Sequence, residues 1–288
     1  MDRVVLIEAI AAGPISGEAL AARFGVSRAM VWKGIEALRS EGLSISAKHG
    51  YRLVDASGFG ASTLRWRCQR PVTFLEQTDS TNAVARRQIR DGDRRALVVA
   101  DFQTAGRGRR GRSWTSRPGE NLLFSLVLTP AVPPQHAPRC VLIWAAAMAE
   151  VLGVQLKWPN DLVDTEGRKI GGILAELDAV GDEVRAVILG VGLNVNQEHF
   201  EGLPLATSLR RLRGAPVDRA ALLAELVEAI EGADVVSGDL SGWRAVSRTL
   251  GRRVRINDIE GIAEDVREDG ALLVGGQAVL AGDVEMVG

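Results

Sequence analysis

The chain has few cysteines, no long apolar run and almost no net charge, and each shortage excludes a class of protein. Cys68 and Cys140 are the only cysteines, and neither belongs to a C-x-x-C pair. They indicate a reducing compartment and argue against a zinc site. No apolar run approaches the ~20 residues of a membrane span, so we expect no contact with a membrane. The net charge of −1 excludes a uniformly basic chain, and any contact with nucleic acid must come from a local patch.

The N-terminus also lacks the pattern of a signal peptide. Acidic Asp2 and Glu8 lie inside a helical pattern, whereas a signal peptide begins with a positively charged segment. Together with the two isolated cysteines, this predicts a cytoplasmic protein. Internal repeats are absent too. The length of 288 residues allows two or three globular domains.

What the chain does have is a cluster of arginine and glycine at residues 106–112, which read Gly-Arg-Gly-Arg-Arg-Gly-Arg. Charged guanidinium groups cannot pack into an apolar core, and each glycine costs a helix about 1 kcal/mol relative to alanine. Residues 106–112, here called the arginine loop, form a segment that is suited to close around a phosphate or a carboxylate. Its glycines match G-x-G-x-x-G, but residues 113–119 do not begin the helix that a dinucleotide fold requires. A solvated basic loop or a nucleic-acid patch is the alternative.

Residues 1–57 have the order of elements of a winged helix-turn-helix domain. Gly13-Pro14 ends a first helix, and Ser16 and Ser27 are suited to cap a second and a third helix. Two short alternating strands follow within residues 43–53. This order predicts a DNA-binding domain whose third helix enters the major groove.

The third helix carries the side chains that would contact DNA. We expect Arg28, Lys33 and Arg39 to face solvent, where they would meet phosphates or base edges. A merely solvated helix face is the alternative, because residues 1–55 carry seven basic and six acidic residues, a net charge of only +1. Gly34 is expected to weaken this helix.

Two further domains are expected, which makes the fold class a multidomain α+β protein. Residues 62–246 mix helices with near-continuous apolar strands, which is typical of an α/β domain with a mixed sheet. The expected strands are 97–100, 122–128, 170–177 and 186–195, and the expected helices are 139–152 and 220–230. Residues 248–288 favour a small SH3-like β-barrel, because short strands alternate there with turns at Asp269-Gly270 and Gly275-Gly276.

Four polar segments interrupt the central domain where apolar strands end. They are Asp79–Asn82, Gln103 with the arginine loop, Lys157–Asp161 and Arg168–Gly172. The hydroxyl and amide groups of the first segment suit a ureido or amide group of a ligand, or they only cap a helix. Trp158, Asn160 and Asp161 suit a base ring and a metal ion or amine, or form an ordinary turn. Lys169 can offer its charge to a carboxylate or an α-phosphate, or it lies at the surface.

Together and in this order, these segments resemble the biotin protein ligases, most closely the bifunctional bacterial type with an N-terminal winged helix. The matching residues are Thr78–Asn82, Gln103–Trp114, Asn121-Leu122, Lys157–Asp161, Arg168–Leu177, Gly190–Asn196 and Ala206–Leu209. The resemblance covers essentially the whole chain, and its most specific parts are the arginine loop and Lys-Trp-Pro-Asn-Asp.

The resemblance implies a two-step activity. Biotin reacts with ATP and Mg²⁺ to give biotinyl-5′-AMP, and the biotin then passes to a lysine of a biotin carboxyl carrier domain. It also implies a biotin-responsive transcriptional repressor that binds operator DNA as a homodimer.

The resemblance assigns roles to individual residues. Biotin would be bound by Ser80, Thr81, Asn82, Gln103, Arg107, Gly108, Arg109 and Lys169. ATP would be bound by Arg109, Arg110, Arg112, Trp114, Asn160, Asp161 and Asn194. The catalytic residues would be Lys169, Asp161 and Arg109, with Asp161 also a ligand of Mg²⁺. DNA would be contacted by Ser27, Arg28 and Lys33.

Three other functions are compatible with parts of the sequence. A lipoate-type protein ligase would use the same adenylate chemistry, but the arginine loop and Trp158-Pro159 argue against it. A non-enzymatic, ligand-sensing DNA-binding regulator would explain the winged helix, but not the retention of Lys157, Asp161 and Lys169. A structural nucleic-acid binder would leave the Lys-Trp-Pro-Asn-Asp segment unexplained.

Overall fold

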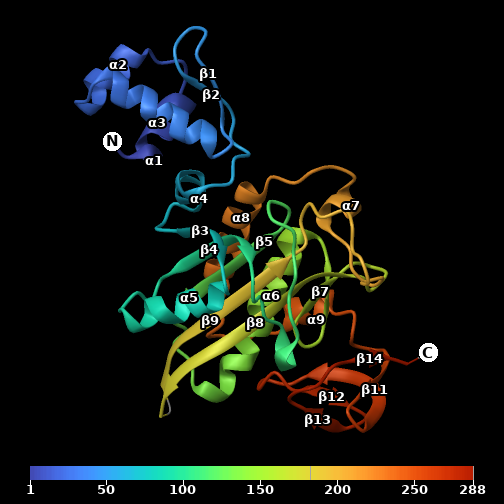
Figure 1. Ribbon diagram of the computed structural model, residues 1–288. Coiled ribbons are helices and arrows are strands. Elements are labelled where there is room, and N and C mark those ends of the chain that lie inside the picture. The colour runs from blue at the N-terminus through green and yellow to red at the C-terminus, as the bar shows by residue number, and fades with distance from the viewer. Residues whose placement is uncertain (182, 288) are drawn as a thin grey trace. The chain divides into compact units, whose positions relative to one another are not determined.

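Three short helices and a two-stranded hairpin form the N-terminal part of the chain (Figure 1). They are α1 (Arg3–Ala11), α2 (Gly17–Phe24), α3 (Arg28–Ser40), β1 (Ser44–Ser46) and β2 (Arg52–Asp55). The structure is a computed structural model and describes residues 1–181 and 183–287. Ser16 accepts a hydrogen bond from the Ala19 N–H at 3.0 Å, and Ser27 from the Met30 N–H at 3.2 Å. Both predicted helix caps are therefore confirmed.

Gly34 is explained by the packing of α3 against α1. The residue is buried, and a Cβ at this position would lie less than 3 Å from side-chain atoms of Met1 and Leu6. Leu6 and Ile35 are fully buried in the same apolar core. The glycine thus allows a close approach of the two helices, which offsets its cost to helix stability.

Arg39 does not face solvent as expected. Its guanidinium donates to Glu36 Oε1 at 2.7 Å and to the Ile45 carbonyl at 2.7 Å. The side chain therefore ties the end of α3 to strand β1. The expectation was wrong because helical spacing alone does not reveal a carbonyl that arrives from the following strand.

A fourth helix, α4 (Ala61–Cys68), follows the hairpin and was not predicted. Its first turn is held by Glu41, whose carboxylate accepts from the Ser62 N–H at 2.8 Å and from Ser62 Oγ at 2.7 Å. A carboxylate at a helix N-terminus also interacts favourably with the helix dipole. Residues 1–74 and 218–224 form one compact unit, and the rest of the chain forms a second.

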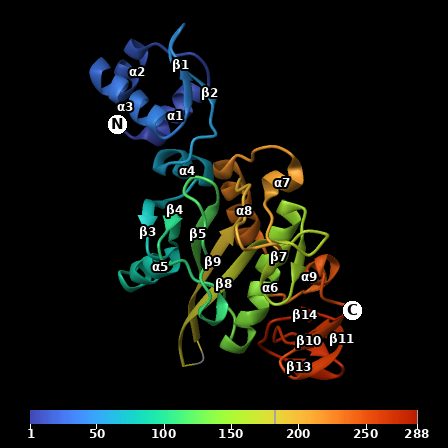
Figure 2. The same ribbon diagram turned by 45° about the vertical axis from the view of Figure 1, so that its right-hand side comes forward.

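The second unit is built on a seven-stranded sheet with the order β3-β4-β5-β9-β8-β7-β6. The strands are β3 (Thr73–Thr78), β4 (Leu97–Gln103), β5 (Leu122–Leu128), β6 (Gln155–Lys157), β7 (Asp161–Val163), β8 (Lys169–Val180) and β9 (Glu183–Leu193). The pairings from β4 across to β6 are antiparallel. The long strands β8 and β9 run side by side through the middle of this unit (Figures 1 and 2).

Helices cover the sheet and complete its core. Helix α5 (Thr81–Arg90) packs against β4, β5 and β9, and α6 (Ala137–Leu152) packs against β6, β8 and β9. The remaining helices are α7 (Leu209–Arg213), α8 (Arg219–Gly232) and α9 (Ser241–Val246), with 3-10 turns η1 (Arg109–Gly111) and η2 (Pro134–His136). No helix in the described part of the chain is both long and apolar enough to cross a bilayer.

The apolar runs predicted the long strands well. Residues 122–128 form β5 with the expected bounds, and the runs at 170–177 and 186–195 form the paired strands β8 and β9. The short strands β3, β6 and β7 were not predicted, because three to six residues of mixed polarity carry little periodic signal.

The C-terminal strands form a five-stranded antiparallel sheet with the order β13-β12-β11-β10-β14. The strands are β10 (Arg253–Ile256), β11 (Ile259–Val266), β12 (Leu272–Val274), β13 (Gln277–Val279) and β14 (Glu285–Met286). Val254, Val266 and Leu272 are fully buried beneath it. The short alternating strands that the sequence predicted for this region are therefore present, and they form an antiparallel sheet.

Trp158 joins these strands to the central sheet. Its indole N–H donates to the Gly270 carbonyl at 3.2 Å, and its backbone N–H donates to Thr249 Oγ1 at 2.9 Å. The side chain is only 2% exposed, so little of its ring is available to stack on a base as the sequence suggested. A buried tryptophan with a bonded N–H is a core residue.

Candidate functional site

A cavity of about 130 Å³ lies where the starts of β8 and α5 meet the arginine loop. Twelve residues expected from the sequence to bind ligand line it, namely Ser80, Thr81, Asn82, Gln103, Arg107, Gly108, Arg109, Arg112, Trp114, Asn160, Asp161 and Lys169. Residues that were not assigned a role also line it, namely Ser113, Gly172, Ile173, Leu174, Gly190, Val191 and Gly192. The two motif glycines in β9 were visible in the sequence, but nothing local indicated that they form a wall of the cavity.

Two expected residues do not line this cavity. Arg110 lines an adjoining cavity instead. Asn194 is 5% exposed, and its amide donates to the Thr207 carbonyl at 3.1 Å. Asn194 therefore contacts the chain segment that follows β9 rather than the open space.

One end of the cavity is polar and uncharged, and it is formed at the start of α5. Gln103 Oε1 accepts from the Thr81 N–H at 2.7 Å and lies 3.1 Å from Thr81 Oγ1. Ser80 occupies the N-cap position, yet its side chain makes no capping hydrogen bond. Helix capping is thus performed from β4 by Gln103, and Ser80 lines the cavity instead.

Asn82 connects this end of the cavity to the sheet. Its amide nitrogen donates to the Leu174 carbonyl at 3.3 Å and to Glu176 Oε1 at 3.1 Å, while its Oδ1 accepts from Ser125 Oγ at 2.6 Å. Asn82 also fills the space beside Gly190, where a Cβ would overlap with it. A glycine is required at that position because the amide occupies the room of a side chain.

The other end of the cavity is charged. Lys169 Nζ donates to Asp161 Oδ1 at 2.6 Å, and β7 pairs with β8 so that Asp161 lies opposite Gly172. The Lys169 backbone is fixed by hydrogen bonds to Leu205 (N to O, 2.6 Å) and Thr207 (O to N, 2.9 Å). The lysine thus projects from a braced strand end with a carboxylate as its partner.

Trp114 forms the wall between the two ends. Its ring lies 5.8 Å from Lys169 Nζ and packs against Gly192, where a Cβ would lie 2.5–2.9 Å from three indole atoms. The indole Nε1 is buried and has no hydrogen-bond partner among the described residues. An unpaired buried donor is costly, and a ligand acceptor in the cavity would satisfy it.

The arginine loop is folded back on itself and closed by backbone hydrogen bonds. The Trp114 N–H donates to the Gly106 carbonyl at 2.9 Å, and the Gly108 N–H donates to the Arg112 carbonyl at 2.7 Å. Arg110 adopts a positive φ of 56° within the turn. The loop therefore has a defined conformation that the chain itself maintains.

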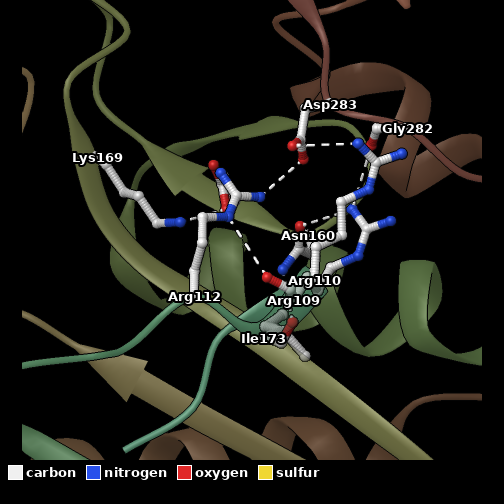
Figure 3. Close-up of polar contacts among 9 residues, drawn as sticks. Arg109, Arg110, Arg112, Asn160, Lys169, Ile173, Gly282 and Asp283 are labelled. Carbon is white, nitrogen blue, oxygen red and sulfur yellow. Dashed lines mark hydrogen bonds and ion pairs between the residues drawn. The ribbon is translucent and has the colours of Figure 1, made fainter. Parts of the chain in front are cut away.

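Three of the four guanidinium groups of this loop, those of Arg109, Arg110 and Arg112, are held by protein acceptors (Figure 3). Arg109 donates to Asn160 Oδ1 at 3.3 Å and to the Gly282 carbonyl at 3.4 Å. Asp283 lies between two further arginines, 2.8 Å from Arg112 and 3.6 Å from Arg110. Burial lowers the pKa of Arg109 from its usual value, and the Asp283 carboxylate partly opposes that shift. Sequence reasoning missed Asp283, because it reaches the loop from the C-terminal strands and belongs to no motif.

The carboxylates of the site fit a metal ion only if substrate supplies most of its ligands. Among the described residues, no group of three or more His, Cys, Asp or Glu side chains could hold a metal. Asp161 is the one carboxylate among the described residues of the cavity wall. Mg²⁺ usually binds through phosphates and water with one or two carboxylates, so this donor set suits Mg²⁺ that arrives with a nucleotide.

An adjoining cavity of about 430 Å³ shares Arg109, Asn160, Ile173 and Leu174 with the first. The rest of its wall is mainly apolar and includes Pro134, Pro138, Val141, Leu142, Pro159, Leu177 and Leu280. It thus leads along β8 and the start of α6 to the charged end of the first cavity.

The N-terminal unit presents a separate candidate interface on α3. Arg28 and Lys33 are exposed on this helix, as expected. Trp32 is 54% exposed on the same helix. Ser27 caps the helix and is itself exposed.

Comparison with known proteins gives two domain matches. Residues 74–194 match the model of the biotin/lipoate A/B protein ligase family. Residues 5–52 match the model of an HTH domain. The two matches fall on the central sheet and on the N-terminal helices, respectively.

Relatives of similar length are found among characterised proteins. The chain is 33% identical over 308 residues to the bifunctional ligase/repressor BirA of Bacillus subtilis (strain 168), with 94% of each chain covered. It is 36% identical over 241 residues to the biotin--[acetyl-CoA-carboxylase] ligase of Mycobacterium tuberculosis (strain ATCC 25618 / H37Rv), covering 75% of this chain and 88% of the other. The structure of the biotin protein ligase from Aquifex aeolicus in complex with biotin and ATP superposes with a TM-score of 0.61 and 27% identity, covering 75% of this chain and 98% of that one.

Proposed function

Because the chain belongs to the biotin/lipoate A/B protein ligase family, we propose that it activates biotin with ATP and transfers it to a lysine of a biotin carboxyl carrier domain. The observation that carries this proposal is the two-ended cavity. Its neutral end offers hydroxyl and amide groups to a ureido ring, and its charged end offers cations to a carboxylate and phosphates. A lipoate substrate has no ureido group to satisfy the neutral end, which favours biotin.

In the first step, a biotin carboxylate oxygen attacks the α-phosphorus of ATP, and the bond to the bridging oxygen breaks to release pyrophosphate. Two anions approach each other and more charge develops on the phosphate oxygens. Lys169, Arg109 and Arg112 stabilise this charge, because all three are cations that line a partly enclosed site. Mg²⁺, when bound, neutralises phosphate charge, and Asp161 and Asn160 are the side chains that would hold it.

The arginine loop exchanges partners during this step. Arg109 leaves Asn160 and Gly282, and Arg112 leaves Asp283, in order to bind phosphates. Arg110 lines the adjoining cavity and joins the nucleotide only when the loop moves. The rearranged arginine loop then covers the site and protects the mixed anhydride, biotinyl-5′-AMP, from water. Asn194 contributes by holding the segment after β9 against the nucleotide side of the site.

In the second step, the neutral amine of the carrier lysine attacks the carbonyl carbon of biotinyl-5′-AMP, and the bond to the phosphate oxygen breaks to release AMP. Asp161 orients the amine and accepts its proton. Once biotin has taken the place of Asp161 at Lys169, the pairing of β7 with β8 keeps the carboxylate at the required place. The adjoining apolar cavity is the route by which the carrier domain brings its lysine to Asn160 and Asp161.

A second role, biotin-responsive repression, is supported by the N-terminal helices and by the bifunctional relatives. Arg28 and Lys33 would bind operator DNA, and Ser27 would hold the start of the helix beside the DNA backbone. A homodimer would present two such helices to a two-fold operator. Residues 1–57 would bind DNA, residues 62–246 would carry out catalysis, and residues 248–288 would support the arginine loop. The protein would act in the cytoplasm.

Transfer of biotin to a carrier tests the enzyme directly. The purified chain, ATP, Mg²⁺, biotin and an apo carrier domain should give a carrier heavier by one biotinyl group at one lysine, as measured by mass spectrometry. A parallel reaction with lipoate should leave the carrier unmodified. Absence of both pyrophosphate release and carrier modification would contradict the proposal.

DNA binding is tested separately, by the salt dependence of binding to a generic DNA duplex. Replacing Lys33 or Arg28 by alanine should reduce the slope of log K against log salt by about one for each phosphate that the variant no longer neutralises. An unchanged slope in both variants would exclude the proposed helix face.

A further inference from the structure

A chain of hydrogen bonds links Glu176, on β8, to the cavity wall at Thr81. Glu176 Oε1 and the Leu174 carbonyl both accept from the Asn82 amide nitrogen, at 3.1 and 3.3 Å. On its other side, Asn82 Oδ1 lies 2.6 Å from Ser125 Oγ, which lies 2.7 Å from Thr81 Oγ1. Thr81, Asn82 and Ser125 are each at most 5% exposed, so water does not compete for these bonds.

The donors and acceptors in this chain fix its direction. A carboxylate and a carbonyl can only accept, so they use both amide hydrogens of Asn82. Asn82 therefore turns Oδ1 toward Ser125, whose single hydroxyl hydrogen must be donated to it. Ser125 Oγ in turn accepts the hydroxyl hydrogen of Thr81.

Thr81 consequently presents lone pairs, and no hydrogen, to a ligand. Gln103 Oε1 lies 3.1 Å from Thr81 Oγ1, but it already accepts the Thr81 backbone N–H at 2.7 Å. If the Thr81 hydroxyl hydrogen were donated to Gln103 instead, no hydrogen would lie between Thr81 Oγ1 and Ser125 Oγ. These two oxygens would then repel each other at 2.7 Å. Donation to Ser125 is the arrangement that avoids this contact.

We propose that Glu176 is a positioning residue, which fixes the direction of this chain and so makes Thr81 an acceptor for a ring N–H of biotin. The role rests on the proposed function, and it specifies what sets the polarity of the biotin head-group site. Arg86, on α5, forms an ion pair with the second carboxylate oxygen of Glu176 and so compensates its charge. Glu176 lines the adjoining cavity but not the first, so it reaches the biotin head-group site only through Asn82.

Glu176→Gln should reverse the direction of the hydrogen-bond chain while it keeps the size of the side chain at this position. Arg86 is donor-only and will take the glutamine carbonyl, which turns the glutamine NH₂ toward the Asn82 NH₂. Asn82 must then flip against the Leu174 carbonyl or give up a hydrogen bond, and a flip lets Thr81 donate. Adding Arg86→Met frees the glutamine to turn its carbonyl back to Asn82, which restores the original direction.

The experiment measures binding to the full chain by calorimetry, with biotin and with its two oxazolidinone analogues, in which a ring oxygen replaces one or the other ureido N–H. The unmodified chain should bind biotin at least tenfold more tightly than the analogue whose ring oxygen faces Thr81. Glu176→Gln should weaken biotin binding by about tenfold and reduce that preference to less than threefold. The double variant with Arg86→Met should recover most of the preference.

Two further variants separate this role from a general structural one. Ser125→Ala interrupts the chain and should also reduce the preference, which provides a test even if Glu176→Gln folds poorly. Asp178→Asn removes a carboxylate further along β8, outside the wall of either cavity, and should keep the preference. An unchanged preference in folded Glu176→Gln, or a double variant as impaired as the single, would overturn the role of Glu176. Failure of the unmodified chain to bind biotin would instead contradict the proposed function.

Discussion

The ammonium group of Lys169 and the carboxylate of Asp161 lie 2.6 Å apart, across the antiparallel pairing of β7 and β8. The lysine is the cation that would meet the biotin carboxylate, and the aspartate is the group that would receive the carrier lysine. Their contact implies that the first substrate competes with Asp161 for Lys169. Binding biotin would then leave Asp161 available for the second step.

Lys169→Ala should therefore impair adenylate formation more than any loss of stability can explain. We expect ATP–pyrophosphate exchange in the presence of biotin to fall at least a hundredfold, which corresponds to about 3 kcal/mol of transition-state stabilisation. Arg117→Gln removes an exposed cation that lies outside the cavity wall and serves as the control. Exchange within threefold of the unmodified rate in Lys169→Ala would remove Lys169 from the catalytic residues.

Gly192→Ala should displace the indole of Trp114, because the added Cβ would lie within 3 Å of three ring atoms. The wall between the neutral and the charged end would shift, and we expect the affinity for biotin to fall about tenfold, roughly 1.4 kcal/mol. The control is Gly242→Ala in α9, where the nearest heavy atom lies 3.8 Å from the new Cβ. Calorimetry that finds both variants equal in affinity would show that the indole position does not matter.

Asp283→Asn should loosen the arginine loop in the absence of substrate. Exposed ion pairs are each worth about 0–1 kcal/mol, so we expect trypsin to cut the loop a few times faster at low salt. The difference should shrink at high salt, where the ion pairs are screened, and in the presence of biotin and ATP. Glu285→Gln, which removes a carboxylate of a neighbouring exposed pair, controls for a general change of charge. Equal cleavage rates of Asp283→Asn and the unmodified chain would show that Asp283 does not hold the loop.

Asp164→Asn should reduce the stability of the turn that leads into Lys169. Burial raises the pKa of Asp164, but hydrogen bonds from the Arg168 side chain and from the Arg168 and Glu166 N–H groups lower it by more, so the pKa lies below its usual value. A carboxyl whose pKa is lowered by folding stabilises the protein above its unfolded value of about 4, and the contribution disappears as pH falls through the folded value.

The variant should accordingly lose about 2 kcal/mol of unfolding free energy at pH 7. The difference from the unmodified chain should decrease when both are measured below pH 4. Chemical denaturation across this pH range provides the measurement, with Glu166→Gln, an exposed carboxylate of the same turn, as the control. A difference that is constant with pH would show that the charge of Asp164 is not responsible.

The fold was predictable wherever one segment carried its own signal. Helix caps at Ser16 and Ser27 and the apolar run of β5 needed no knowledge of the rest of the chain. The polar segments at the strand ends likewise predicted which side chains meet in the cavity. Each of these features depends on residues that are close in sequence.

What was not predictable depends on partners that are distant in sequence. Asp283 reaches the arginine loop from outside every matching segment, and Glu176 reaches Asn82 across the fold. Glu176 lies within the matching segment Arg168–Leu177, but nothing in that segment indicated its partner. Arg39 and Trp158 are less exposed than the sequence suggested for a related reason, because a carbonyl from another element binds each of them. Exposure on an isolated element does not reveal a neighbour that only tertiary structure provides.

The hydrogen bonds of Trp158 to Gly270 and Thr249 have a consequence for how such chains can recombine. The tryptophan belongs to the same five residues as Asn160 and Asp161, so the C-terminal strands are part of the support of the catalytic segment. A gene fusion that exchanged residues 248–288 for an unrelated β domain would remove the acceptors of the indole N–H and of the backbone N–H of Trp158 and would disturb the neighbouring Asn-Asp pair. We therefore expect the C-terminal strands to be inherited together with the candidate site, and changes in the two to accompany each other between lineages.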